Sequence, residues 1–309
     1  MNLEKEINEI VGFKNLELLA TQVVEGFISG LHKSPFHGFS AEFAEHKIYN
    51  NGESTKHIDW KLFAKTDKLY TKRYEEETNL RCHLILDNSS SMHYPAKGEM
   101  HIKSLNKIGF CSLASAAIMN LMKRQRDSVG MSIYSDHYEF YSNEKASERH
   151  HQKLLQQLNK AIGSKNSGVQ TKTYAHLHLI AEKLKRRSLV FLFTDMFQSD
   201  KEQHELFEAL QHLKYNKHEV VLFHTYDKEK ELRFDFNNRP KKFVDIETSE
   251  HINLYPDNVK QSYETAVQSY FDTLALKCGH YRIKYVPVDV NENFNTILTT
   301  YLVERARFG

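Results

Sequence analysis

A short run of acid and hydroxyl side chains follows an apolar stretch at residues 83–92, which read HLILDNSSSM. Within this run, Asp87, Ser89 and Ser91 are spaced two residues apart, so in an extended loop their side chains point to the same side. One carboxylate and two hydroxyls are hard oxygen ligands, which suit Mg²⁺ or Mn²⁺ better than zinc. Three ligands do not complete an octahedron, so a metal site here needs donors from elsewhere in the chain.

Two later segments supply candidate donors. The apolar stretch LVFLF at residues 189–193 runs into Thr194 and Asp195, which places a second acid directly after an expected strand. Between the two acids, the segment GVQTKTYAHL at residues 168–177 offers a hydroxyl shortly before an expected helix. Either Thr171 or Thr173 could supply this hydroxyl.

These residues can meet only if their strands end at one edge of a sheet, and the pattern after residue 80 predicts such strands. Strands are expected at residues 81–86, 129–135, 138–141, 188–193, 219–224 and 281–286. Helices are expected at residues 102–123, 151–162, 175–185, 201–214, 259–277 and 293–305. This alternation predicts an α/β fold with a doubly wound, mostly parallel sheet. Ligands of such sheets bind beyond the carboxyl ends of the strands, where Asp87 and Asp195 would lie.

Two regions stand outside this alternation. Residues 1–79 read as an N-terminal extension of the α/β domain at residues 80–309, with an amphipathic helix over 15–28 and an edge strand or hairpin arm over 69–75. Within the domain, residues 231–256 alternate apolar and polar side chains and contain two turn signals, which predicts a β-hairpin insertion. We interpret this insertion as structural, with a docking surface as the alternative.

The set of D-x-S-x-S, a later threonine and a strand-terminal aspartate resembles the metal-ion-dependent adhesion site (MIDAS) of von Willebrand factor A domains. In that family the serines and the threonine bind a metal directly, and the aspartates bind it directly or through water. One coordination position stays open for a carboxylate of the partner. The resemblance implies a von Willebrand A-like fold and a site for Mg²⁺ or Mn²⁺ made of Asp87, Ser89, Ser91, Thr171 and Asp195.

A second resemblance covers nearly the whole chain, from about Leu16 to Arg307. The residues that carry it are Tyr49 with the turn at 50–52, the block His57-Ile58-Asp59-Trp60, Ala64 and Glu77. This pattern is similar to the bacterial domain-of-unknown-function 58 family, although Glu53-Ser54 stand where its turn usually has aspartates. Genes of that family commonly lie beside MoxR-type AAA+ ATPases. The resemblance therefore implies an adaptor or co-chaperone that binds such an ATPase or its client protein.

Composition sets further limits on function. The 309 residues include 42 basic and 40 acidic ones, and this balance does not indicate a nucleic-acid or membrane partner. No apolar run reaches the ~20 residues that span a bilayer, and the N-terminus lacks the hydrophobic stretch of a signal peptide. The 3 cysteines form no CxxC pair, which fits reduced thiols, so we expect a cytoplasmic protein.

The main alternative function is a Mg²⁺-dependent phosphohydrolase with Asp87 as the nucleophile. Such an enzyme needs a second acid two residues on, where this chain has Ser89, and a phosphate-positioning lysine that the sequence does not reveal. A serine hydrolase is disfavoured because no G-x-S-x-G surrounds the serines, and no P-loop motif is present. We therefore expect a binding module and not an enzyme, with a metal-free scaffold as a third interpretation.

The remaining distinctive side chains receive structural interpretations. Trp60 is expected in the core or between packed segments, and Asp59 at a helix N-cap or in a salt bridge. The basic run from Lys183 to Arg187 is expected in the last turn of a helix, where cations complement the helix dipole. The 18 histidines include neighbouring pairs, but none of these pairs is spaced to share a helix face, so no zinc site is predicted.

Overall fold

A six-stranded sheet forms the centre of the structure, a computed structural model that describes residues 16–28, 40–50, 55, 58–77, 80–95, 105–164, 172–196, 203–246 and 250–308. The strand order is β10-β7-β6-β3-β4-β5, and the pairings are parallel except that of β5 with β4. The strands are β3 (Arg81–Asp87), β4 (Ser128–Tyr134), β5 (Tyr138–Lys145), β6 (Leu189–Thr194), β7 (Glu219–Tyr226) and β10 (Lys284–Asp289). The predicted doubly wound, mostly parallel α/β sheet is therefore confirmed.

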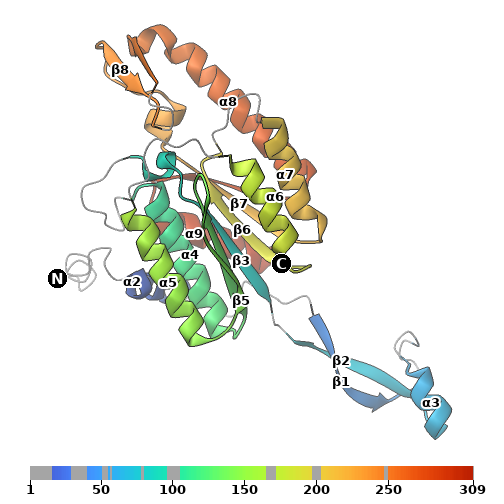
Figure 1. Cartoon of the computed structure of the whole chain (residues 1–309). Helices are drawn as coiled ribbons and strands as arrows, with labels where there is room; N and C mark the ends of the chain where they lie inside the picture. The colour runs from blue at the N-terminus through green and yellow to red at the C-terminus, as the bar shows by residue number, and fades with distance from the viewer. Residues whose placement is uncertain are drawn as a thin grey trace.

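Helices cover both faces of this sheet (Figure 1). One face carries α2 (Leu16–Ile28), α4 (Lys107–Arg124), α5 (Glu148–Gly163) and α9 (Phe294–Phe308). The other face carries α6 (Thr173–Lys183), α7 (Gln203–Tyr215) and α8 (Pro256–His280). Strand β6 feeds both cores, because Phe191 and Phe193 pack into the first core while Val190 and Leu192 pack into the second. Burial on both faces explains why this strand is apolar throughout.

The strand order reverses next to β3. The chain runs from β3 to β4 on one side and later places β6 on the other side of β3. The carboxyl ends of β3 and β6 are therefore neighbours at a topological switch point, which is the usual ligand position in sheets of this kind.

An antiparallel arm leads into β3 and projects from the body (Figure 1). It consists of β1 (Ser40–Ile48), a short helix α3 (Trp60–Thr66) and β2 (Tyr70–Glu77), which confirms the predicted hairpin arm. Asp59 caps α3 by accepting hydrogen bonds from the N–H groups of Lys61 and Leu62, as predicted. The prediction for Trp60 is wrong: its side chain is 61% exposed, because α3 has no buried residues and lies away from the core.

The insertion between β7 and α8 is only partly a hairpin. Its first residues form a π-helical turn, η3 (Lys228–Leu232), and the paired strands are β8 (Lys241–Val244) and β9 (His251–Leu254). The hairpin predicted over 231–256 is therefore confirmed only in its later part. The turn at its start exists because Asp227 caps it, accepting hydrogen bonds from the N–H groups of Glu229 and Lys230.

Two predicted helix ends are displaced. The helix expected from residue 102 begins at Lys107, since the Asn106 side chain caps it by accepting a hydrogen bond from the Gly109 N–H. Helix α6 ends at Lys183, so Lys185 to Arg187 form the turn before β6 and not a last helical turn. Within the ranges given above, no helix combines the length and the apolar character needed to cross a bilayer.

Gly130 in β4 packs against the buried hydrogen bond between His83 and Glu144, so a side chain at residue 130 would test how tightly the sheet is packed there. A Cβ at residue 130 would lie 2.7 Å from the Ser142 carbonyl oxygen and 2.8 Å from His83 Nδ1. Gly130→Ala should therefore lower the free energy of unfolding by about 1–3 kcal/mol in urea titrations. Gly279→Ala in α8 is the control, because its added Cβ meets nothing within 4 Å. That variant should be neutral or more stable by up to ~1 kcal/mol, and equal losses in both variants would contradict the packing described here.

Asp127 should make stability depend on pH. One of its carboxylate oxygens accepts a hydrogen bond of 2.8 Å from the Leu80 N–H, and burial raises the pKa of Asp127 from 3.8 to about 6. The folded chain thus keeps a proton that the unfolded chain releases, so the contribution of Asp127 is complete below about pH 4 and lost as the pH rises through about 6. Asp127→Asn retains the accepting oxygen without the charge. The difference in unfolding free energy between wild type and variant should change across this window, and a constant difference would refute the assignment.

Candidate functional site

The predicted serines and the first aspartate meet at the end of β3. Asp87 is 2% exposed. Its Oδ1 accepts a hydrogen bond of 2.9 Å from the Ser89 N–H, and its Oδ2 accepts one of 2.8 Å from the Thr194 hydroxyl. The hydroxyl oxygens of Ser89 and Ser91 lie 3.0 Å apart. These oxygens meet as the sequence predicts, although Ser91 lies in a 3-10 turn, η2 (Ser90–His93), and not in the extended loop that the spacing argument assumes.

The second predicted acid lies beside this group. Asp195 follows the last residue of β6, on the strand next to β3, and its side chain is buried. Burial and the negative charge of Asp195 together raise the pKa of Asp87 to about 6. The two carboxylates therefore share one poorly solvated region at the switch point.

Of the two candidate threonine ligands, the structure describes only Thr173. Thr171 lies outside the residues that the structure describes. Thr173 is the first residue of α6, is 1% exposed and lies within hydrogen-bonding reach of the Tyr134 hydroxyl. The Tyr134 hydroxyl lies 3.4 Å from Asp87 Oδ2, and burial together with the Asp87 charge raises the pKa of Tyr134 well above its usual value. Thr173 thus lies in the same group as Asp87, which we call the strand-end cluster: Asp87, Ser89, Ser91, Tyr134, Thr173, Thr194 and Asp195.

A buried lysine completes the cluster. The Lys107 ammonium is fully enclosed and donates a hydrogen bond of 3.1 Å to Asp195 Oδ2 and another to Glu231 Oε1. Burial alone would lower the pKa of Lys107, but the charges of Asp195 and Glu231 outweigh burial and raise the pKa. Burial raises the pKa of Glu231, although the Lys107 charge acts in the opposite direction. Lys107 therefore links Asp195 of the strand-end cluster to Glu231 of the η3 turn.

The sequence interpretation missed several of these residues. Tyr134 ends β4 in register with Asp87, and Thr194 ends β6, so the rule about carboxyl ends of strands could have found both. Lys107 gives a weaker signal: it is a cation in the first turn of a helix, where the dipole disfavours positive charge. No sequence signal marks Glu231, because its contact with Lys107 joins residues that are 124 positions apart in the chain.

The chemistry of the donors fits a hard divalent cation. The carboxylates of Asp87, Asp195 and Glu231 outnumber the one ammonium of Lys107, so the buried cluster carries excess negative charge when ionised. In the described part of the chain, no three His, Cys, Asp or Glu side chains are grouped so that they could hold a metal ion. A metal here would therefore need hydroxyl ligands, which the two serines and Thr173 provide. Carboxylate and hydroxyl oxygens are the ligands that Mg²⁺ accepts.

The sequence matches a known family over most of its length. The profile of the family described as "Protein of unknown function DUF58" matches residues 45–270. The chain belongs to this family. The DUF58 match begins within β1 and ends within α8, so it includes the arm, the strand-end cluster and the hairpin insertion.

Curated relatives and solved structures give more distant similarities. Three uncharacterized proteins, Mb1516 of Mycobacterium bovis and MT1527 and Rv1480 of Mycobacterium tuberculosis strains, are each 26% identical over 81 residues. That segment is 26% of this chain and 26% of each relative, so the match spans about a quarter of their length. Among solved structures, BatB from Bacteroides thetaiotaomicron is 13% identical, with a TM-score of 0.41, over 74% of this chain and 99% of its own. An aerotolerance-related membrane protein from Bacteroides fragilis is 12% identical, with a TM-score of 0.44, over 74% and 100%.

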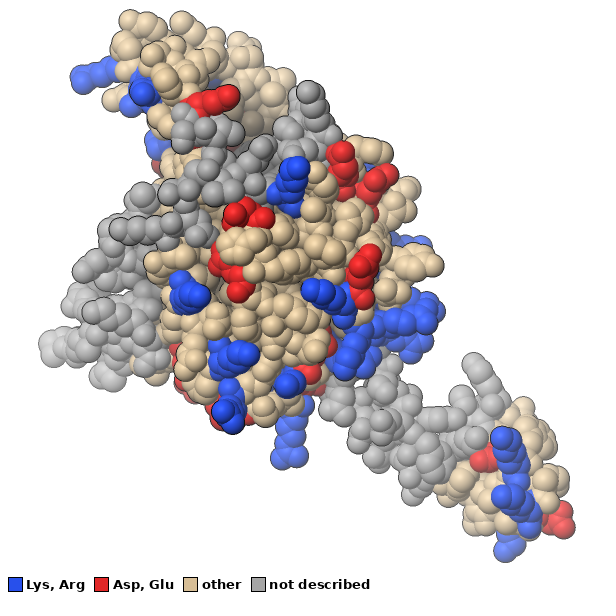
Figure 2. All heavy atoms as spheres, in the orientation of Figure 1, with Lys and Arg blue, Asp and Glu red and all other residues tan. Residues whose placement is uncertain are grey.

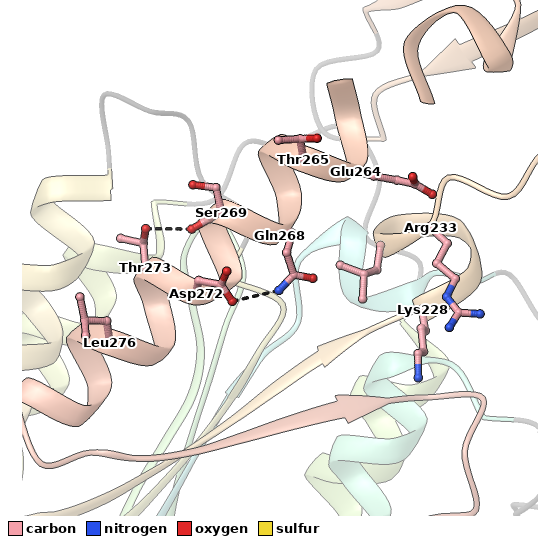
Figure 3. Close-up of a pocket in the computed structure, with 10 residues that line it drawn as sticks. Lys228, Arg233, Glu264, Thr265, Gln268, Ser269, Asp272, Thr273 and Leu276 are labelled. Carbon is pink, nitrogen blue, oxygen red and sulfur yellow. Dashed lines mark hydrogen bonds between the residues drawn. The ribbon is translucent and has the colours of Figure 1, made fainter. Parts of the chain in front are cut away.

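Two surface hollows lie apart from the cluster. A groove of about 1020 Å³ separates the η3 turn, with Lys228 and Arg233, from the outer surface of α8 (Figure 3). Its α8 side carries Glu264, Gln268 and Asp272, and the side chains of Gln268 and Asp272 hydrogen-bond to each other. A second hollow of about 460 Å³ lies under the β8–β9 hairpin and has an apolar lining: Phe234, Phe243, Ile252, Leu254, Val259 and Tyr263. Neither hollow includes a residue predicted to bind metal.

The buried ion pairs of Lys107 should dominate its contribution to stability. Lys107→Met would leave Asp195 and Glu231 without their buried cation, so we expect a loss of about 3–5 kcal/mol in the free energy of unfolding. Lys123→Met is the control: Lys123 pairs with Glu148 at the surface, with its side chain 40% exposed, and should lose at most ~1 kcal/mol. Urea titrations would measure both. Combining Lys107→Met with Glu231→Gln should cost less than the sum of the two single changes, and strict additivity would contradict the contact.

Proposed function

We propose that the chain is a protein-binding module whose strand-end cluster holds Mg²⁺ or Mn²⁺ and captures a carboxylate of a partner protein. The observation that carries this proposal is the meeting of Asp87, Ser89, Ser91 and Asp195 at the switch point of the sheet. The excess of buried carboxylates over ammonium groups supports a cation there. In this proposal the cluster would act as the MIDAS of von Willebrand A-like domains does, which its D-x-S-x-S motif resembles.

Each residue of the cluster has a role in this proposal. Asp87, Ser89, Ser91 and Asp195 would hold the metal together with Thr173 or Thr171, and the bound metal supplies an electrophilic position for an incoming carboxylate. Thr194 and the Ser89 N–H hold the Asp87 carboxylate in place. Lys107 holds Asp195 from the side of the insertion.

The partner proposed is a MoxR-type AAA+ ATPase or its client protein. Membership of the DUF58 family supports this choice through the gene neighbourhood that the family resemblance implies. The hairpin insertion would help select the partner, since the apolar hollow beneath it is linked to the cluster through Glu231. The cysteines Cys82, Cys111 and Cys278 are buried and not disulfide-bonded, which supports the cytoplasmic location that we propose.

A Mg²⁺-dependent phosphohydrolase with Asp87 as nucleophile remains a second candidate, because Lys107 supplies a lysine close to the second acid. This lysine suits phosphate binding poorly, since two carboxylates hold its ammonium and none of its surface is exposed. Turnover of a generic phosphate ester that is lost in Asp87→Asn would favour the enzyme over the binding module.

Titration calorimetry of Mg²⁺ and Mn²⁺ into the chelator-treated protein tests the metal site. Asp87→Ala and Ser89→Ala should each weaken binding by more than about 100-fold, because losing a direct ligand costs more than losing a residue that only orients a ligand. Ser90→Ala is a matched control, since Ser90 is equally buried in the same loop but out of the alternating register. Thr171→Val and Thr173→Val compared side by side identify the threonine ligand.

Circular dichroism should show that each variant keeps the wild-type fold. Equal metal affinity in wild type, Asp87→Ala and Ser90→Ala would refute the site. Wild-type protein that binds neither metal alone, nor in the presence of acetate as a stand-in for the partner's carboxylate, would also refute it.

A further inference from the structure

The amino-terminal edge of the sheet, opposite the strand-end cluster, carries a row of basic residues. Two residues before β4, β6, β7 and β10 stand Arg126, Arg187, Lys217 and Arg282 respectively. Strand β3 starts with Arg81, and the antiparallel strand β5 ends at this edge with Lys145. Each of the six strands therefore has one cation at the same edge. With strands about 4.8 Å apart, the row extends over roughly 24 Å.

Four of these residues adopt a backbone conformation that side chains disfavour. Arg126, Arg187, Lys217 and Arg282 have φ angles of 60°, 59°, 60° and 56°, in the left-handed region. At Arg126 and Arg282 the hydrogen bonds form a Schellman motif, in which the N–H of the next residue reaches back to Met122 and Cys278 carbonyl oxygens respectively. Glycine is the usual residue at such positions. The chain thus uses Arg or Lys four times where glycine would be less strained.

Compensation of helix dipoles does not account for this choice. A cation in the last helical turn complements the dipole without any left-handed backbone, and α4 already has Lys123 and Arg124 there. Helix α8 likewise has Lys277 and His280 in its last turn. The additional cations at the left-handed positions therefore require another explanation.

The charges of the row are available to a partner. Arg126, Lys145, Arg187, Lys217 and Arg282 are exposed, and none forms an ion pair with another described residue. Acidic side chains at this edge are largely engaged elsewhere: Asp127 accepts from Leu80, Glu144 pairs with His83, and Glu304 pairs with Lys284. Figure 2 shows Lys and Arg gathered on the body beside the base of the arm.

We propose that this basic edge binds an acidic, extended segment of a partner protein. Extended polypeptide rises about 3.3 Å per residue, so a segment of roughly seven residues spans the row. Because alternate side chains point to opposite faces, about four of them face the row and can bring carboxylates to its cations. Guanidinium groups favour such partners, because they bind carboxylates with two parallel hydrogen bonds.

Shape and charge favour a peptide over other anions. The arm projects from this same edge (Figure 1), so a flat membrane could not approach the row, whereas a slender chain can lie along it. Glu219 at the start of β7 and the exposed Glu182 interrupt the positive charge. A continuous phosphate backbone would meet these acids, but a peptide can place neutral residues opposite them.

Glycine substitutions at the four left-handed residues test the proposal, because glycine removes the charge and also adopts the left-handed backbone without strain. Fluorescence anisotropy would follow a labelled peptide of about ten residues with alternating Glu and Ser, beside its Gln/Ser counterpart. Arg126→Gly, Arg187→Gly, Lys217→Gly and Arg282→Gly should each weaken Glu-peptide binding about two- to five-fold and the combined variant at least about 15-fold. Their urea midpoints should be unchanged or raised. Lys242→Gln in the hairpin and Asp87→Ala at the opposite edge should bind as wild type.

Several results would overturn the proposal. The proposal is wrong if the Glu peptide does not bind or if the Gln peptide binds as tightly as the Glu peptide. It is also wrong if the combined glycine variant binds the Glu peptide with wild-type affinity. Lower urea midpoints in the glycine variants would show that the cations serve the fold. A labelled oligothymidylate that binds more tightly than the Glu peptide, and depends on the same four residues, would assign the edge to nucleic acid instead. Because Asp87→Ala leaves this edge intact, failure here and failure of the metal site are separable.

Discussion

A lysine ammonium with no exposed surface stays charged only if carboxylates surround it, because its isolated burial costs several kcal/mol. Lys107 therefore fixes the positions of Asp195 and Glu231 relative to the start of α4. Glu231 is in turn held by its neighbours, since its Oε2 accepts from the Asp227 N–H and its carbonyl oxygen accepts from the Tyr263 hydroxyl. Asp195 after β6, the start of α4 and the η3 turn thus share one electrostatic constraint, which lies beside the proposed metal site.

The sheet and its helices could be predicted because their signals are local. Strand β6 is apolar at every position since it feeds two cores, and the alternation of strands with helices leaves few other folds. Exposure could not be predicted in the same way. Trp60 is apolar, yet it lies on an arm whose short helix has no core to enter. Whether an apolar residue is buried depends on where its segment ends in space, and the local sequence does not contain that information.

The candidate site likewise has some residues that the local sequence predicts and others that it does not. Asp87, Ser89 and Ser91 lie within five residues, and Asp195 ends a strand of obvious pattern, so their meeting follows from the topology. Lys107 and Glu231 reach the cluster from a helix start and a π-helical turn that are 124 residues apart. The turn itself was predicted as part of a hairpin. An acid supplied by an irregular segment leaves no periodic trace, which is why Glu231 went unpredicted.

The two edges of the sheet carry opposite charge for different physical reasons. At the carboxyl edge the acids are buried and hold fixed hydrogen bonds. At the amino edge the row crosses six strands, and its cations other than the half-buried Arg81 are exposed and form no ion pair with a described acid. Strand β3 is 7 residues long, so the edges are about 23 Å apart. A single extended segment that bound both edges would have a higher overall affinity than at either edge alone, because binding at one edge raises its effective concentration at the other. The arm leaves the body beside the basic edge, whereas α3 with the exposed Trp60 lies at the far end of the arm (Figure 1), so a segment that only spans the row does not reach the tryptophan.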